Sequence, residues 1–119
     1  MKYGRKISGG RYHKSRKKKL YELPGIKRTV RLGEEKKKTV KIRGGKKKTF
    51  LFKSKLINLV VSGKTKKVEI KNVVETPSNR FLARQNVLTK GTIVETGMGR
   101  ARVTNRPGQE GVVNGVLIK

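Results

Sequence analysis

Residues 56–70 read LINLVVSGKTKKVEI, and this stretch decides the fold. A dense apolar run at 56–61 is followed by the pair Ser62-Gly63, and apolar and polar side chains then alternate at 68–70. Alternation with a period of two is typical of half-buried strands, and a Ser-Gly pair between two such runs is typical of a turn. The stretch therefore predicts a β-hairpin.

The same pattern continues on both sides of this hairpin. Residues 39–53 alternate around a basic loop at 44–48, and residues 87–95 lead through a glycine-rich turn at 97–99 into an alternating segment at 100–104. Residues 112–118 predict a last strand, in which a bulge at Asn114-Gly115 is favoured over another hairpin turn. Such a pattern indicates an all-β barrel or sandwich, and we expect a small β-barrel of about six to seven short strands with a long basic, mostly irregular N-terminal extension.

The positive charge is concentrated in the first half of the chain. The 119 residues include 33 Lys and Arg and 7 acidic residues, all of them Glu, which gives a formal net charge of +26. Residues 1–55 hold 22 basic and 3 acidic side chains, whereas large apolar residues become frequent only from Phe50 onward. We therefore expect a basic N-terminal extension at 1–38 and a β-barrel domain at 39–119. Within the extension, we expect residues 15–23 to form a short helix once their charge is neutralised, and Pro24-Gly25 to end it.

The composition argues against an enzyme. The chain has no cysteine, no Asp and one His, so it offers neither thiolate sites nor the side chains that usually perform acid–base chemistry. Gly97 and Gly99 lack the strand and helix that a phosphate-binding loop requires. We expect no metal, no cofactor and no small-molecule substrate. Since no long apolar run is present, we also expect a soluble, cytoplasmic protein that does not bind membranes.

A charge of this size indicates a nucleic-acid partner. Each phosphate that a protein neutralises releases counterions, and a chain this basic can neutralise on the order of ten phosphates. In the extension, cations alternate with Tyr3, Tyr12 and Tyr21, whose rings can stack on unpaired bases. His13 has no second ligand residue nearby, so stacking or a phosphate hydrogen bond is its functional interpretation. The alternative is a solvated tail with incidental tyrosines.

Two groups of basic residues lie in the β domain. Arg43-Gly44-Gly45 and the lysines after it form a predicted hairpin tip, for which the alternative is a solvated loop that protects a sheet edge. Arg100 and Arg102 share one face of a predicted strand, and the guanidinium fork suits phosphate. For these arginines the alternative is an ordinary polar strand face.

Charge alone does not separate RNA from DNA. A DNA-binding architectural or chromatin protein would use a groove-reading helix or a wedge, and the sequence predicts neither. A glycine- and lysine-rich arm on a β domain suits threading between RNA helices, where phosphates order the irregular backbone. DNA binding stays the alternative. A membrane-active cationic protein would need an amphipathic helix, against which the period of two argues.

Several motifs resemble a known family. They read RKISGGRYH at 5–13, KKKLYEL at 17–23, RGG at 43–45, NVLTKG at 86–91 and ARVTNRPGQEGVVN at 101–114. In order and over essentially the whole chain, they are similar to small-subunit ribosomal protein eight of the archaeal and eukaryotic type. The chain lacks the long insertion of eukaryotic members, so it resembles an archaeal one.

The resemblance implies an architectural protein that binds small-subunit ribosomal RNA, beside neighbouring ribosomal proteins and without forming a homo-oligomer. The RNA-binding candidates that the matching motifs carry over are Arg5, Lys6, Ser8, Gly9, Arg11, Tyr12, His13, Arg16, Lys17, Lys18, Arg43, Gly44, Arg102 and Arg106. The remaining candidates are Lys2, Tyr3, Gly10, Lys14, Lys19, Arg28, Arg31, Lys46, Lys47 and Arg100.

Overall fold

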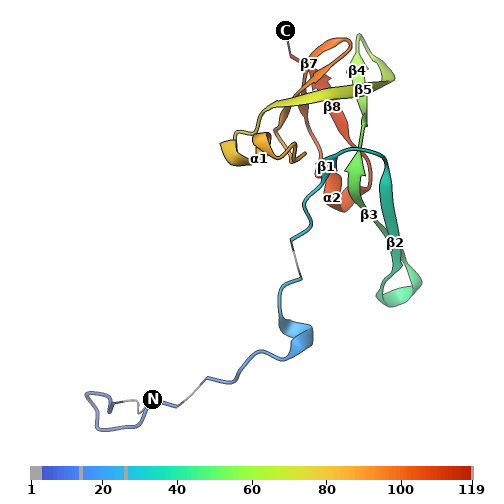
Figure 1. The fold of residues 1–119 in the computed structure, drawn as a ribbon. Helices are drawn as coiled ribbons and strands as arrows, with labels where there is room; N and C mark the ends of the chain where they lie inside the picture. Colours follow the sequence, from blue (N-terminus) through green and yellow to red (C-terminus); the bar gives the residue numbers. More distant parts are fainter. Residues whose placement is uncertain (1–3, 14, 26, 119) are drawn as a thin grey trace.

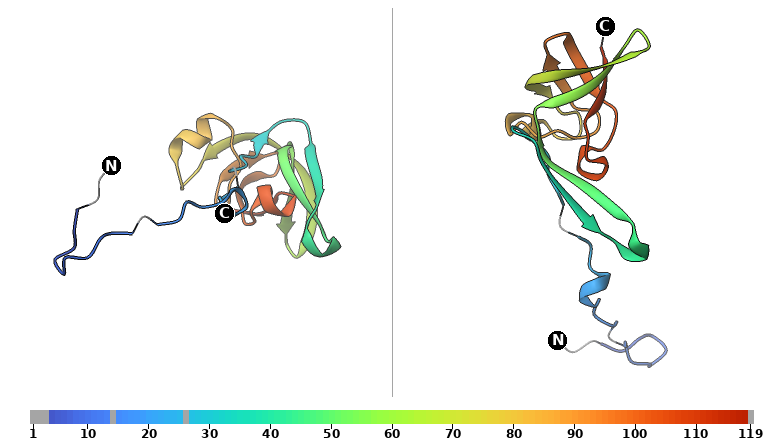
Figure 2. Two further views of the ribbon diagram at one scale, coloured as in Figure 1. Left: turned by 90° about the horizontal axis from the view of Figure 1, so that it is seen from below. Right: turned by 90° about the vertical axis from the view of Figure 1, so that its right-hand side faces the viewer.

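A computed structural model describes residues 4–13, 15–25 and 27–118. An extended N-terminal arm leads into a β domain built from eight strands and short helical turns (Figure 1). The radius of gyration is 21.1 Å, whereas a compact chain of this length has about 13.5 Å. The arm accounts for the difference, because it extends away from the domain in every view (Figures 1 and 2).

Five strands form a closed barrel in the order β4-β5-β6-β7-β8. All neighbours are antiparallel except β4 and β8, which close the barrel as a parallel pair. At this seam Asn58 lies opposite Asn114, and its Nδ2 donates a hydrogen bond of 3.0 Å to Asn114 Oδ1. The bounds are β4 Leu56–Val61, β5 Lys64–Glu75, β6 Ile93–Thr96, β7 Gly99–Val103 and β8 Asn114–Leu117.

Alternate side chains of these strands fill the barrel. Ile57 and Leu59 of β4, Val94 of β6 and Ala101 and Val103 of β7 are almost completely buried, and together they form the centre of the hydrophobic core. The predicted hairpin at 56–70 is confirmed. Its turn places Ser62 and Gly63 at φ values of 48° and 77°, and two positive φ values in a row are what a tight turn between twisted strands requires.

A second, three-stranded sheet of order β1-β3-β2 adjoins the barrel. It consists of β1 (Arg31–Leu32), β2 (Lys36–Lys41) and β3 (Lys47–Ser54), and β2 and β3 form a hairpin that projects from the barrel (Figure 2). Val30 and Leu51 join the common core. The hairpin predicted at 39–53 is therefore confirmed, and its first strand begins at Lys36. The division of the chain into a basic N-terminal extension at 1–38 and a β-barrel domain at 39–119 stays a prediction.

The mainly β barrel fold is confirmed, but several local features differ from expectation. In the chain without a polyanion, residues 15–23 contain only a 3₁₀ turn, η1 (Leu20–Glu22), and the helix expected there after charge neutralisation stays a prediction. Lys17, Lys18 and Lys19 repel one another, and a short helix without a buried face is marginal in water. Residues 87–92 precede the strand rather than belong to it, although Val87 and Leu88 are buried.

The last strand and the loop before it also differ from expectation. β8 runs through Asn114-Gly115 as one strand, as predicted, but its pairing with β4 is regular and needs no bulge. The loop at 105–111 contains a helical turn, α2 (Pro107–Glu110), and the unassigned segment at 81–85 forms α1 (Arg80–Arg84). Asn79 begins α1, because its Oδ1 accepts a hydrogen bond of 2.9 Å from the backbone N–H of Phe81.

Candidate nucleic-acid interface

The arm, defined here as residues 4–25, has no hydrophobic anchor of its own. Within its described residues every side chain is exposed except that of Glu22, which is half-buried. Leu20 and Tyr21 retain 86% and 70% of their accessible surface, so even the large apolar side chains lie outside the core. Within the described residues, no buried apolar side chain of the arm offsets the entropy of ordering this segment.

The first part of the arm folds into a tight loop that gathers cations. The backbones of Arg5 and Arg11 pair in an isolated antiparallel β-bridge. The N–H of Lys6 donates to the carbonyl of Gly10 at 2.9 Å, and Gly9 adopts a φ of 78°. The Nζ of Lys6 lies 5.7 Å from the centre of the Tyr12 ring. The loop thus brings Arg5, Lys6, Arg11 and Tyr12 together, although they are separated in sequence. Three cations at one site favour an anionic ligand.

The second part of the arm contains an internal ion pair. The guanidinium of Arg16 donates two hydrogen bonds to the Glu22 carboxylate, at 2.8 and 3.0 Å. The pKa of Glu22 lies below its ordinary value because of Arg16, and the backbone N–H of Lys19 lowers it further. Glu22 therefore competes with phosphate for Arg16, whereas Lys17 and Lys18 extend into solvent.

The β2–β3 hairpin presents a second group of cations. Its tip is the 3₁₀ turn η2 (Arg43–Gly45), in which Gly44 and Gly45 have φ values of 79° and 74°. On the two strands Lys41 lies opposite Lys47, and like charges in that position destabilise a sheet. The repulsion between these two lysines destabilises the hairpin, and a phosphate that contacts both side chains would reduce it.

Arm and hairpin project from the same end of the barrel. Figure 1 and the right-hand view of Figure 2 show both pointing away from the turn between β4 and β5. Arg28 links them, because its guanidinium carbon lies 3.7 Å from the centre of the Phe50 ring on β3. This arrangement creates one basic side of the molecule, along which a polyanion can contact arm and hairpin together.

The predicted barrel arginines have a different setting. Arg100 and Arg102 point outward from β7, as expected from the buried positions of Ala101 and Val103. Arg100 lies opposite Glu95, so a carboxylate stands beside it on the neighbouring strand. Both arginines lie on the barrel wall rather than on the arm or the hairpin, and their contact with RNA stays a prediction.

The residues around Arg106 hold the fold together. Asn105 Nδ2 donates to the carbonyl of Val112 at 2.8 Å and to Glu110 at 3.0 Å, and its Oδ1 accepts the N–H of Asn114 at 3.0 Å. Glu110 accepts the backbone N–H of Arg106, and this bond, followed by that from Asn105, lowers the pKa of Glu110. The motif at 101–114 is therefore in large part structural, and the Arg106 side chain remains exposed.

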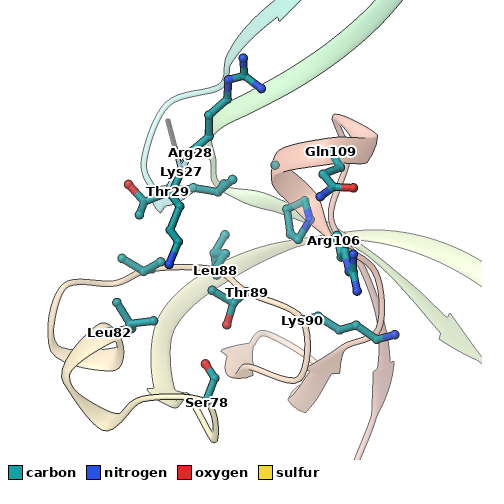
Figure 3. Close-up of a pocket in the computed structure, with 14 residues that line it drawn as sticks. Lys27, Arg28, Thr29, Ser78, Leu82, Leu88, Thr89, Lys90, Arg106 and Gln109 are labelled. Carbon is teal, nitrogen blue, oxygen red and sulfur yellow. The ribbon is translucent and has the colours of Figure 1, made fainter. Parts of the chain in front are cut away.

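A cavity that the sequence did not indicate lies at the root of the arm. It has a volume of about 550 Å³ and is lined by residues 27–30, 87–90 and 106–109 together with Ser78 and Leu82 (Figure 3). Lys27 and Lys90, neither of them a sequence-based candidate, lie beside it with Arg106. Apart from the charge of these residues, nothing in the sequence indicated this site, because the four segments that line the cavity come together only in the folded chain.

The other candidates are placed as follows. Arg31 lies in β1 and is exposed. Ser8 and Gly10 belong to the loop of the arm, His13 follows it, and Lys19 lies 5.9 Å from the centre of the Tyr21 ring. Arg43, Lys46 and Lys47 surround the hairpin tip. Lys2, Tyr3 and Lys14 lie outside the described residues.

The structure also gives two negative findings for its described ranges. In residues 4–13, 15–25 and 27–118, no three His, Cys, Asp or Glu side chains gather in a way that would hold a metal ion. Over the same ranges, no helix reaches the length and apolar character needed to cross a membrane.

Comparison with known proteins gives matches over nearly the entire chain. The family model described as Ribosomal protein S8e matches residues 1–118. A protein of Nanoarchaeum equitans named small ribosomal subunit protein eS8 is 44% identical over 117 residues, which are 97% of this chain and 92% of that protein. Proteins of the same name from Haloarcula marismortui and Methanocella arvoryzae are 44% and 41% identical, over 97% and 96% of this chain and 94% and 93% of their own lengths.

Proposed function

Since this chain belongs to the Ribosomal protein S8e family, we propose that it is a structural constituent of the small ribosomal subunit and binds small-subunit ribosomal RNA. The family is one of structural ribosomal proteins, so the chain is not an enzyme and works in the cytoplasm, within the ribosome. Its RNA contacts come from the arm and from the β2–β3 hairpin. Neighbouring ribosomal proteins are its other partners, and it acts as a single copy.

The observation that carries this proposal is the exposure of the arm. A segment that combines a dense row of cations with exposed Leu20 and Tyr21 gains nothing from its own β domain. Phosphates on several sides would neutralise the cations, and unpaired bases would cover the apolar and aromatic surfaces. The arm loop around Gly9 and the Arg16–Glu22 pair provide a partly formed shape for that contact.

DNA binding is not favoured. The two α-helices of the described chain, α1 and α2, have 5 and 4 residues, which is too short for a recognition helix that lies in a major groove. An irregular arm suits folded RNA, in which strands approach from several directions. The proposal therefore assigns the basic side of the molecule to RNA and gives it an architectural role in subunit folding.

The proposal is tested by RNA binding as a function of salt. The full chain and a variant lacking residues 1–20, which hold nine Lys and Arg and no acidic residue, are titrated against transcribed small-subunit RNA. Each lost phosphate contact lowers the slope of log affinity against log salt by about 0.7–0.9, so we expect a clear reduction. Since none of the described residues in this segment, 4–13 and 15–20, belongs to the core, the thermal midpoint should not change.

Two results would contradict the proposal. Deletion of residues 1–20 with no change in affinity or slope would remove the arm from the RNA interface. Duplex DNA that competes as well as RNA at equal phosphate concentration would favour the alternative class of nucleic-acid partner.

A further inference from the structure

The cavity at the root of the arm combines an apolar floor with a cationic rim. Its volume of about 550 Å³ falls in the range of about 300–1,000 Å³ that small-ligand sites occupy. Its apolar lining combines the half-buried Leu82 with Val30, Val87 and Leu88, which are at most 2% exposed, and with the buried Pro107. This floor is part of the core, so it keeps its shape without a ligand.

Backbone hydrogen bonds fix the two sides of the floor to each other. The N–H of Leu88 donates to the carbonyl of Val30 at 2.8 Å, and the N–H of Leu32 donates to the carbonyl of Asn86 at 2.9 Å. These bonds tie residues 30–32, which follow the arm in sequence, to the segment before β6. An RNA strand that contacts the arm along its length would therefore reach the cavity, whose lining begins at residue 27.

Three cations from three different segments lie at the edge of the opening. Figure 3 shows Lys27 on one side of the hollow and Lys90 and Arg106 on the other, with the end of the Lys90 side chain extending outward. The guanidinium of Arg28 is directed elsewhere, onto the Phe50 ring. Ser78, Thr89 and Gln109 add hydroxyl and amide groups to the lining. The carboxylate of Glu110 lies near this rim, where it accepts the N–H of Arg106 and the side-chain amide of Asn105.

We infer that this cavity binds one unstacked nucleotide of the RNA, with its base against the apolar floor and its phosphate at the cationic rim. The inference rests on the proposed function and adds a defined site to it. A nucleotide has both required faces: a flat, largely apolar base with hydrogen-bonding edges and adjacent phosphodiester groups that each carry one negative charge. An apolar side chain of another protein would fit the floor but would leave the three cations unneutralised. Continuity with the arm supplies the path by which RNA reaches the site.

The test uses the full chain and transcribed small-subunit RNA. Ultraviolet cross-linking followed by peptide mass spectrometry reports which peptides carry a nucleotide. We expect adducts on the arm and on peptides that contain residues 27–30, 87–90 or 106–109. The variant Ser78→Trp places a large side chain at the exposed edge of the cavity, and it should abolish the cavity adducts and weaken RNA binding by about tenfold, the equivalent of a stacking contact of ~1.4 kcal/mol.

Matched controls come from β5, outside the cavity. Thr65→Trp adds the same ring at another exposed position, and it should keep affinity and adducts. Lys90→Gln removes one rim charge and should lower the salt slope by about 0.7–0.9, the effect of one phosphate contact. Lys66→Gln is the control for that charge and should leave the slope nearly unchanged.

The outcomes separate this inference from the proposed function. If the unchanged chain does not bind the RNA, the proposed function fails, and the inference fails with it. If the chain binds and the arm is labelled, but the cavity is not and Ser78→Trp binds like Thr65→Trp, only the inference is overturned. It is also overturned if a free mononucleotide labels the cavity as strongly as RNA does. Loss of a neighbouring protein from subunits carrying Ser78→Trp, with RNA binding intact, would assign the cavity to that protein.

Discussion

Gly115 lies where β8 leaves no space for a side chain. A Cβ atom there would be 2.8 Å from Ile57 Cδ1 and 2.9 Å from the carbonyl oxygen of Arg102. The first of these neighbours is packed in the core, and the second belongs to the backbone of β7. The sequence pair Asn114-Gly115 suggested a turn or a bulge, whereas the glycine is required by close packing inside a regular strand.

We predict that Gly115→Ala destabilises the barrel by about 1–3 kcal/mol, the usual cost of overpacking a core. Urea unfolding followed by circular dichroism measures the change. Gly97→Ala is the matched control, because a Cβ at Gly97 meets no atom within 4 Å. Equal unfolding midpoints for the two variants would show that β8 can move to make room.

Glu110 gives a pH-dependent contribution to stability. Its pKa is lowered from the ordinary value of 4.5, first by the backbone N–H of Arg106 and then by Asn105. A carboxyl group whose folded-state pKa is lowered stabilises the fold above its unfolded pKa and loses that contribution as the pH falls through the folded one. The loop that joins β7 to β8 is therefore weakened in acid.

We predict that Glu110→Gln lowers the urea midpoint at pH 7 and that the difference from the unchanged chain shrinks as the pH falls below 4.5. Unfolding curves at a series of pH values test this. Glu75→Gln, at an exposed position of β5, is the control. A difference that stays constant, or grows in acid, would contradict the role given to the ionised carboxylate.

At the scale of elements, strands were predictable and short helical turns were not. The hairpin at 56–70 follows from its alternation and from Ser62-Gly63, because both patterns operate between neighbouring residues. α1 and α2 have 5 and 4 residues, too few for a helical period to show. In the chain alone, residues 15–23 form only the turn η1, because charge repulsion and the absence of a buried face outweigh local propensity. Local sequence therefore predicts an element when its pattern covers several residues and one face is buried.

The β2–β3 hairpin should show opposite effects on stability and on RNA binding. Lys41 and Lys47 face each other across the pair, so Lys47→Gln should leave the thermal midpoint unchanged or raise it slightly. The same change should lower the salt slope of RNA binding by about 0.7–0.9, because one phosphate contact is lost. Lys66→Gln on β5 serves as the control. A Lys47 variant that is less stable and binds RNA equally well would indicate a purely structural lysine.

For the whole molecule, the sequence indicated which half of the chain is basic, but it did not indicate which distant segments come into contact in the fold. The skew of charge toward residues 1–55 predicts the arm, and the lysines at 46–48 predict the hairpin tip. The cavity at the root of the arm was not predictable, because Lys27, Lys90 and Arg106 are far apart in sequence. Their meeting depends on barrel closure, which pairs β4 with β8 and brings residues 106–109 next to residues 27–30.

The contrast between arm and barrel leads to a prediction about amide exchange. Within residues 4–13 and 15–25 the backbone pairings, including the bridge between Arg5 and Arg11, join positions at most six residues apart, and the groups are exposed, so local opening costs little free energy. In the purified chain without nucleic acid, peptides from these residues should exchange within seconds in dilute buffer, while those of β4 and β7 stay protected. Binding to small-subunit RNA should slow exchange in the arm and leave the barrel nearly unchanged, and high salt should reverse this protection. Slow exchange of the arm in the absence of RNA would mean that the β domain itself holds it, and the dependence of its shape on phosphate would have to be abandoned.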